Sequence, residues 1–158
     1  MSPTREIIKL RINGAERSVE ADPASPLIHA LRNQLGLTGT RYGCGANQCG
    51  ACNVMIDGQA VAACVTPLWA TAGKEFVTIE GLGTPERPHP LQRAVIAEQA
   101  SQCGYCLSGI LISAAALLKR TPNPSEAEVR SALDRNLCRC GAHNRIVRAV
   151  LRAAKEVT

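Results

Sequence analysis

The chain has 158 residues, room for one ordinary domain or two small ones, and 46% of them are apolar, enough to form a buried core. Only 3% are aromatic, so the core is built from Ala, Leu, Ile and Val, and small domains of this kind often need metal centres as extra cross-links. The formal net charge is +5, but the basic residues form no run and have no interleaved aromatics, which argues against nucleic-acid binding and favours docking to an acidic protein partner.

The sequence predicts a soluble chain. Its first nine residues contain no apolar core of signal-peptide length and no twin arginine. The longest apolar stretch, residues 106–118, is too short to span a bilayer. We therefore expect a cytoplasmic location without a transmembrane segment. In that reducing compartment eight cysteines predict metal binding rather than disulfides.

The N-terminal part reads as a strand hairpin followed by a helix. Residues 7–12 are rich in Ile and Leu, Asn13-Gly14 is a strong hairpin signal, and residues 16–20 form the returning strand. Apolar side chains then recur at helical spacing over residues 27–35, which predicts a helix packed on the sheet.

The next segment reads as a ligand loop followed by more strands. Residues 36–51 hold five glycines, which permit the backbone to wrap closely around a metal cluster. Residues 54–61 form a second hairpin that carries Cys64 toward this loop, and residues 76–79 read as a closing strand. A compact α+β unit is predicted.

After a proline- and glycine-rich linker at residues 81–90, the chain reads as helical. Helices are predicted at residues 91–99 and 106–119, and Ser125 with Glu128 forms a capping box that starts a third. A last helix is marked by apolar residues from Ile146 onward. Its other face is basic, which more often indicates a solvated surface than a docking site, and carries Arg145, Arg148, Arg152 and Lys155.

The first cysteine set has the C-x4-C-x2-C spacing, with a fourth cysteine further on, that is typical of plant-type [2Fe-2S] ferredoxins: Cys44, Cys49, Cys52 and Cys64. Structural zinc is the alternative, although zinc sites usually combine two C-x2-C pairs. A Rieske centre would need two histidine ligands, and none of the three is placed for it: His29, His89 and His143.

The second set combines a C-x2-C pair with a C-x-C pair: Cys103, Cys106, Cys138 and Cys140. The two helices predicted between the pairs would fold back as a hairpin and bring all four thiols together. This spacing alone also occurs in zinc sites, so its interpretation depends on the first set.

Together the two sets resemble the small iron–sulfur subunit of the molybdenum hydroxylases, the xanthine oxidase family. The resemblance runs over residues 7–153 and is carried by the segments 43–52, 102–106 and 136–141, with Cys64. Within the family the chain is most similar to small subunits of bacterial dehydrogenases for N-heteroaromatic compounds, of the nicotinate and isoquinoline kind.

This resemblance implies an α+β chain with a β-grasp, plant-type ferredoxin domain at residues 1–80, the linker at 81–90 and a four-helix-bundle domain at 91–158, with one [2Fe-2S] cluster in each domain. It also implies a large partner subunit that holds a molybdopterin cofactor in its dinucleotide form and hydroxylates the substrate, an N-heteroaromatic compound or an aldehyde. Electrons would pass from the pterin to the helical-domain cluster, then to the ferredoxin-domain cluster, and then to an FAD subunit or a cytochrome.

The resemblance further implies that Gln102 hydrogen-bonds the molybdenum cofactor and that Cys140 accepts a bond from the pterin amino group. Gln102 as a simple helix cap is the structural alternative. One departure is visible, because many relatives carry an acidic residue where this chain has Gln48. A missing negative charge beside the cluster would raise its reduction potential.

Two other functions remain open from the residues alone. One is a zinc-stapled interaction module, and the other is a free-standing ferredoxin shuttle. No residue pattern indicates a catalytic nucleophile or an acid–base pair, so we expect the chain to be a non-catalytic subunit of an oxidoreductase.

Overall fold

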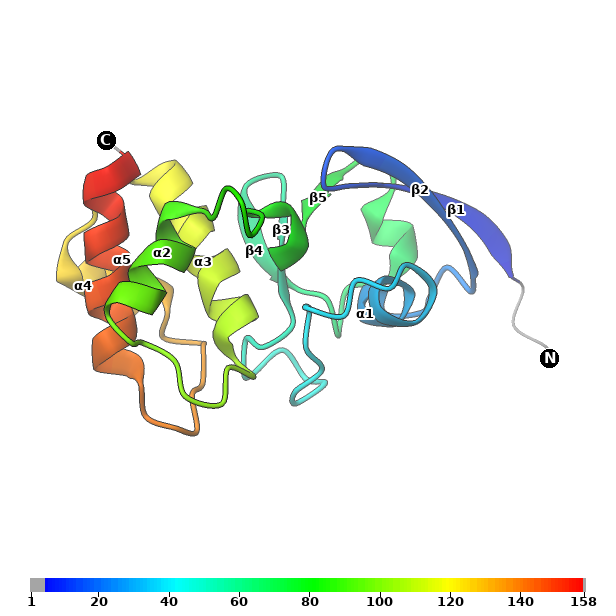
Figure 1. The fold of residues 1–158 in the computed structure, drawn as a ribbon. Coiled ribbons are helices and arrows are strands. Elements are labelled where there is room, and N and C mark those ends of the chain that lie inside the picture. Colours follow the sequence, from blue (N-terminus) through cyan, green and yellow to red (C-terminus); the bar gives the residue numbers. More distant parts are fainter. Residues whose placement is uncertain (1–4, 158) are drawn as a thin grey trace.

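The computed structural model describes residues 5–157. Residues 1–4 of the N-terminal segment, for which the sequence predicts no signal peptide, lie outside the described residues. Figure 1 shows a sheet with a short helix at one end of the molecule and four helices gathered at the other, with β1 and α5 far apart.

One five-stranded sheet, ordered β2-β1-β5-β3-β4, forms the N-terminal part. Strand β5 runs parallel to β1, and the remaining neighbours are antiparallel. The strands are β1 (Glu6–Ile12), β2 (Ala15–Ala21), β3 (Asn53–Ile56), β4 (Gln59–Ala62) and β5 (Glu75–Val77).

Both predicted hairpins are confirmed. Asn13 and Gly14 have φ angles of 52° and 78° between β1 and β2, the left-handed pair that a tight two-residue turn requires. Asp57 and Gly58 do the same between β3 and β4, with φ angles of 49° and 82°. The second hairpin places the residues flanking β3 and β4 side by side at its open end.

The predicted helix at residues 27–35 is present, but most of it is not α-helical. Helix α1 (Leu27–His29) continues as a π-helix (Ala30–Gln34), and the Leu35 N–H donates to the Ala30 carbonyl at 3.1 Å. Leu27, Ile28 and Leu31 are buried in the sheet's core, so the apolar face predicted from their spacing is correct.

The closing strand is shorter than the predicted residues 76–79. Strand β5 ends at Val77, one residue beyond Phe76, the last residue that it pairs with β1. The Thr78 N–H instead donates to the Asn13 side chain at 2.9 Å, and a 3-10 helix (Ile79–Gly81) follows. A second 3-10 helix (Leu68–Thr71) was not predicted.

The four helices predicted after the linker are confirmed as α2 (Pro90–Ala97), α3 (Leu107–Arg120), α4 (Glu126–Ala132) and α5 (His143–Val157). Helix α3 is central, since ten consecutive residues from Gly109 to Leu118 are buried. The Ser125–Glu128 capping box opens α4, and its hydrogen bonds lower the pKa of Glu128. A second capping box, between His89 and Gln92, opens α2 and was not predicted.

The basic stripe on α5 largely faces α2. Arg148 and Arg152 pair with Glu98 at 3.4 and 3.2 Å, and Arg145 donates to the Gln99 carbonyl at 3.2 Å. These contacts hold α5 against the end of α2, so these three arginines of the basic stripe make contacts within the chain.

Buried apolar residues form two clusters. One lies between the sheet and α1, with Phe76, Leu10 and Leu68 among its largest members. The other surrounds α3 and also includes Met55 of β3. Within residues 5–157, no helix is long and apolar enough to cross a membrane.

Candidate metal centres

The first cysteine set is assembled by the ligand loop and the open end of the β3–β4 hairpin. Cys52 directly precedes β3 and Cys64 follows β4, so the strand register brings them to the same end, where the Ala63 N–H donates to the Cys52 carbonyl at 3.2 Å. The Cys64 and Cys49 thiols both influence the pKa of Cys52, and the Cys49 thiol also influences that of Cys44, so the four thiols are neighbours. The four predicted residues therefore meet at one site.

Backbone amides of the loop point at sulfur. The Ala46 and Gln48 N–H groups donate to Cys44 Sγ at 3.4 and 3.2 Å, and the Cys44 N–H donates to Cys49 Sγ at 3.3 Å. The hydrogen bonds from Ala46 and Gln48 lower the pKa of the exposed Cys44 thiol to about 7, because they stabilise negative charge on its sulfur. A Cβ on Gly43 would lie 2.6 Å from Cys49 Sγ, so the chain needs glycine there.

The second set is assembled at the ends of three helices. Cys106 immediately precedes α3, and the chain returns over α4 to place Cys138 and Cys140 just before α5. The Cys140 and Cys138 thiols both influence the pKa of Cys103, and the Cys138 and Cys103 thiols influence that of Cys106. The thiols of the C-x2-C motif and of the C-x-C motif therefore lie next to one another.

One thiol in each set has a raised pKa. Burial raises the pKa of Cys52 to about 12, and burial also raises that of Cys106 to about 12. Cys103, by contrast, is exposed, and a backbone hydrogen bond from Tyr105 lowers its pKa. Thiolate at the buried positions needs a bound cation, since a coordinating thiol loses its proton to the metal's charge.

Four cysteines at each site are the ligand set of a dinuclear iron–sulfur centre, in which each iron takes two thiolates. Structural zinc also accepts four thiolates, but its ligands usually come from two C-x2-C pairs. The all-cysteine donor set and the backbone amides of the first loop that donate to sulfur fit [2Fe-2S] clusters.

Both sets border one groove of about 480 Å³. Its lining includes five of the cysteines: Cys44, Cys49, Cys103, Cys106 and Cys138. Tyr105 and Leu137 also line it and are 50% and 59% exposed, so the groove has an apolar rim open to the surface.

Three hydrogen bonds join the first ligand loop to residues 102–106 and 136–141. The Leu137 N–H donates to the Cys49 carbonyl at 3.0 Å, the Tyr105 hydroxyl donates to the Tyr42 carbonyl at 2.6 Å, and the Asn136 side-chain amide donates to the Gly50 carbonyl at 3.3 Å. Sequence reasoning missed these contacts. Their partners are far apart in the chain, and their acceptors are backbone carbonyls, which any residue type provides.

Gln102 and Cys140, the two residues expected at the pterin, lie side by side. The exposed Gln102 donates its Nε2–H to the Cys140 carbonyl at 3.3 Å. The helix-cap alternative is wrong, because α3 begins at Leu107 and its N-cap, Cys106, makes no side-chain cap bond.

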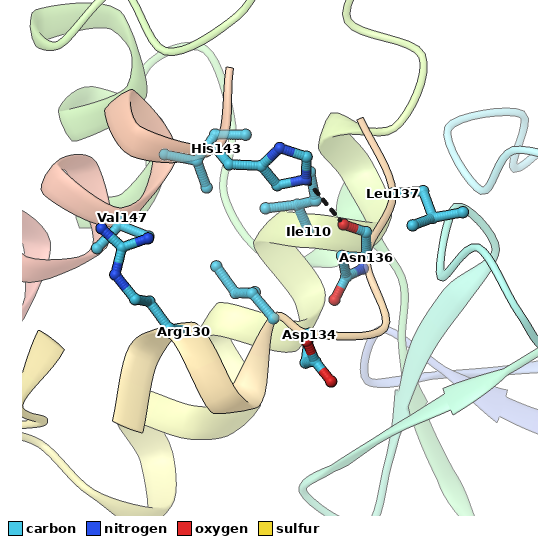
Figure 2. A pocket seen from close by; sticks show the side chains of 9 residues that line it. Ile110, Arg130, Asp134, Asn136, Leu137, His143 and Val147 are labelled. Carbon is cyan, nitrogen blue, oxygen red and sulfur yellow. Dashed lines mark hydrogen bonds between the residues drawn. The ribbon is translucent and has the colours of Figure 1, made fainter. Parts of the chain in front are cut away.

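A separate pocket of about 400 Å³ lies among α3, α4 and α5 (Figure 2) and was not predicted. Ile110 and Val147 lie on its walls, and His143 Nε2 sits 3.2 Å from the Asn136 carbonyl oxygen. A carbonyl only accepts, so this contact requires the Nε2-protonated ring. None of its lining residues is a cysteine. Asn136 and Leu137, which directly precede Cys138, form part of its wall.

Comparison with known proteins assigns each half of the chain to an iron–sulfur family. The 2Fe-2S iron-sulfur cluster binding domain matches residues 10–76, and the [2Fe-2S] binding domain matches residues 78–151.

The chain is similar along its whole length to curated proteins. It is 53% identical to a nicotinate dehydrogenase subunit of Pseudomonas putida, with 94% of each chain covered. It is 51% identical to the alpha subunit of isoquinoline 1-oxidoreductase of Brevundimonas diminuta, over 95% of this chain and 99% of the relative. Aldehyde oxidoreductase of Megalodesulfovibrio gigas is 44% identical over 92% of this chain, but only 16% of that longer protein is covered.

A solved structure supports the same assignment. A chain of quinoline 2-oxidoreductase from Pseudomonas putida 86 matches with a TM-score of 0.92 and 36% identity, over 97% of this chain and 96% of that one.

Proposed function

The chain belongs to the small [2Fe-2S] subunits of the molybdenum hydroxylase family, and from this membership we propose that it relays electrons from a large molybdenum-containing subunit to an acceptor. It is a non-catalytic subunit of an oxidoreductase. The observation that carries the proposal is the gathering of all eight cysteines at two sites, four at each.

We assign one [2Fe-2S] cluster to each set, held by Cys44, Cys49, Cys52 and Cys64 and by Cys103, Cys106, Cys138 and Cys140. A bound [2Fe-2S] cluster accepts and releases one electron. The chain's own residues supply the surroundings. Loop amides stabilise the added negative charge, buried walls exclude water, and the hydrogen bonds between the ligand segments keep the two sites adjacent.

The finer architecture is part of the proposal. We assign residues 1–80 to a β-grasp ferredoxin domain, 81–90 to a linker and 91–158 to a four-helix bundle. Two clusters of buried residues, one around the sheet and one around α3, support this division. The order of strands before helices agrees with it.

The substrate and partners follow from the relatives. Names such as nicotinate dehydrogenase and isoquinoline oxidoreductase support an N-heteroaromatic substrate, with an aldehyde as the second class. The substrate and the molybdopterin dinucleotide would lie in the large subunit, whereas an FAD subunit or a cytochrome would take the electrons. Eight free thiols support a reducing, cytoplasmic location.

Metal analysis of the purified protein tests the assignment. We expect about four irons and four labile sulfides per chain, and two distinct paramagnetic signals after reduction. An iron content near two, or stoichiometric zinc, would contradict it. The protein should also co-purify with a large chain, whereas a free-standing shuttle would purify alone.

A further inference from the structure

Arg135 connects the helical part of the chain to the ligand loop of the first set. It follows α4 and lies three residues before Cys138. Its exposed guanidinium donates from Nη2 to the Asn47 carbonyl at 2.7 Å, across 88 residues of sequence. Asn47 lies in the loop between Cys44 and Cys49, so a cation from one half of the molecule contacts the ligand segment of the other half.

The carbonyl that Arg135 binds belongs to a peptide unit that also contacts sulfur. The Asn47–Gln48 peptide offers its carbonyl oxygen to Arg135, while its N–H donates to Cys44 Sγ at 3.2 Å. The two ends of a trans peptide point in opposite directions along one dipole. A cation at the oxygen end polarises the unit and strengthens its N–H as a donor, because linked hydrogen bonds reinforce each other.

The loop conformation needs such an anchor. Asn47 has a φ of 54°, in the left-handed region that costs most L-residues about 1–2 kcal/mol and that Asn tolerates better than most. The bond from Arg135 fixes the plane of the peptide that follows it. Among the described residues, no carboxylate lies within ion-pair distance of Arg135, so an acidic side chain does not neutralise its charge there.

We propose that Arg135 is a positioning and charge-supplying residue that raises the reduction potential of the cluster held by Cys44, Cys49, Cys52 and Cys64. The proposal rests on the cluster assignment above and extends it to a residue outside both ligand sets. Reduction adds one electron and no proton to this site, and a fixed positive charge with a polarised amide favours the more negative state. The neutral Gln48 at the same peptide acts in the same direction.

Redox titration of the purified complex, followed by electron paramagnetic resonance, measures this effect. The signal of the first set is identified as the one lost in Cys64→Ala. At the wild-type midpoint, Arg135→Gln should lower the ratio of reduced to oxidised cluster roughly three- to tenfold, as expected for removing one nearby charge from a surface site. Arg135→Lys, which keeps the charge, should restore most of the ratio.

Arg130→Gln is the matched control. It removes an equal charge from the same part of the chain, where Arg130 pairs with Glu126 at 2.7 Å, and it should leave the ratio unchanged. An unchanged ratio in Arg135→Gln, or an equal fall in Arg130→Gln, would overturn the proposal. Resonance reports only loaded molecules, so the ratio stays measurable if Arg135→Gln binds less iron. Absence of two signals in the wild type would instead contradict the cluster assignment itself.

Discussion

At the scale of single residues, the two cysteine sets show the same pattern of pKa shifts, although their backbones differ. In each set an exposed thiol, Cys44 or Cys103, receives backbone N–H bonds that lower its pKa, while burial raises the pKa of an inner thiol, Cys52 or Cys106. Each site therefore combines an exposed thiol with a more buried one. The exposed thiols of both sets line the shared groove, and so does the half-buried Cys106.

Gln102 keeps hydrogen-bonding capacity beyond its bond to Cys140. A side-chain amide has two donor hydrogens and an acceptor oxygen, and the bond to the Cys140 carbonyl uses one hydrogen. We propose that this remaining capacity serves a contact with the pterin, and we predict that Gln102→Ala leaves both clusters and the fold intact but slows cluster reduction by substrate in the assembled complex. Rapid mixing with substrate measures that rate.

Gln59 is an exposed glutamine on β4, so Gln59→Ala is the control for loss of an amide side chain. The clusters of this variant should be reduced by substrate at the wild-type rate. Unchanged cluster reduction in Gln102→Ala would show that the proposed contact with the pterin is wrong.

At the scale of secondary-structure elements, the tightest contact between the two halves is that of α3 with the ligand loop. A Cβ on Gly109 would collide with the Gly50 carbonyl oxygen and lie 2.9 Å from the carbonyl of Ala51. Both acceptors belong to backbone between Cys49 and Cys52, so the loop cannot give way without moving ligands. This helix glycine is required for close approach.

We predict that Gly109→Ala destabilises the protein although alanine is the better helix former. The gain in helix propensity is about 1 kcal/mol, whereas overpacking against backbone costs about 3 kcal/mol. The temperature at which visible cluster absorption bleaches should fall by roughly 3–8 °C. Ser131→Ala, at an exposed position of α4, should leave it nearly unchanged, and an equal or raised temperature for Gly109→Ala would refute the close-contact argument.

Sequence patterns predicted most elements because each has a local cause. Asn13-Gly14 and Asp57-Gly58 demand left-handed φ angles, and Ser125 with Glu128 closes a helix end, whatever surrounds them. The end of β5 at Val77 could not be predicted, because it depends on pairing with strands distant in the sequence. Helical spacing likewise does not separate an α-helix from the π-helix at Ala30–Gln34.

The sequence predicted some features of the candidate sites and not others, for the same reason. Spacing identified the eight cysteines and grouped them into two sets of four. It could not show which thiols become neighbours across the motifs, as Cys103 and Cys140 do, because that depends on how α3 and α4 return the chain. The contact of Arg135 with the Asn47 carbonyl was equally hidden, since its acceptor is backbone.

At the scale of the whole molecule, the described residues gather cysteines at two sites but lack a site for chemistry on substrate. Turning over a substrate requires a group that activates water or the substrate, which the relay does not need. We predict that the isolated, iron-loaded chain hydroxylates nothing. An assay with an N-heteroaromatic substrate and an artificial acceptor tests this. Turnover in the absence of molybdenum and of the large subunit would contradict the proposed role, and the complete complex is the positive control.

The hydrogen bond from Leu137 to the Cys49 carbonyl has a consequence for how the sites fill. Metal bound at either set immobilises one end of this bond and so orders part of the other set. Fixing one residue's backbone costs roughly 1–2 kcal/mol, so ordering even one residue in advance favours the second loading by about tenfold. Under limiting iron, native mass spectra at half filling should therefore show about a quarter of the chains half loaded, against about half of them for independent sites. Such coupled filling would present the large subunit with complete relays more often than independent filling does.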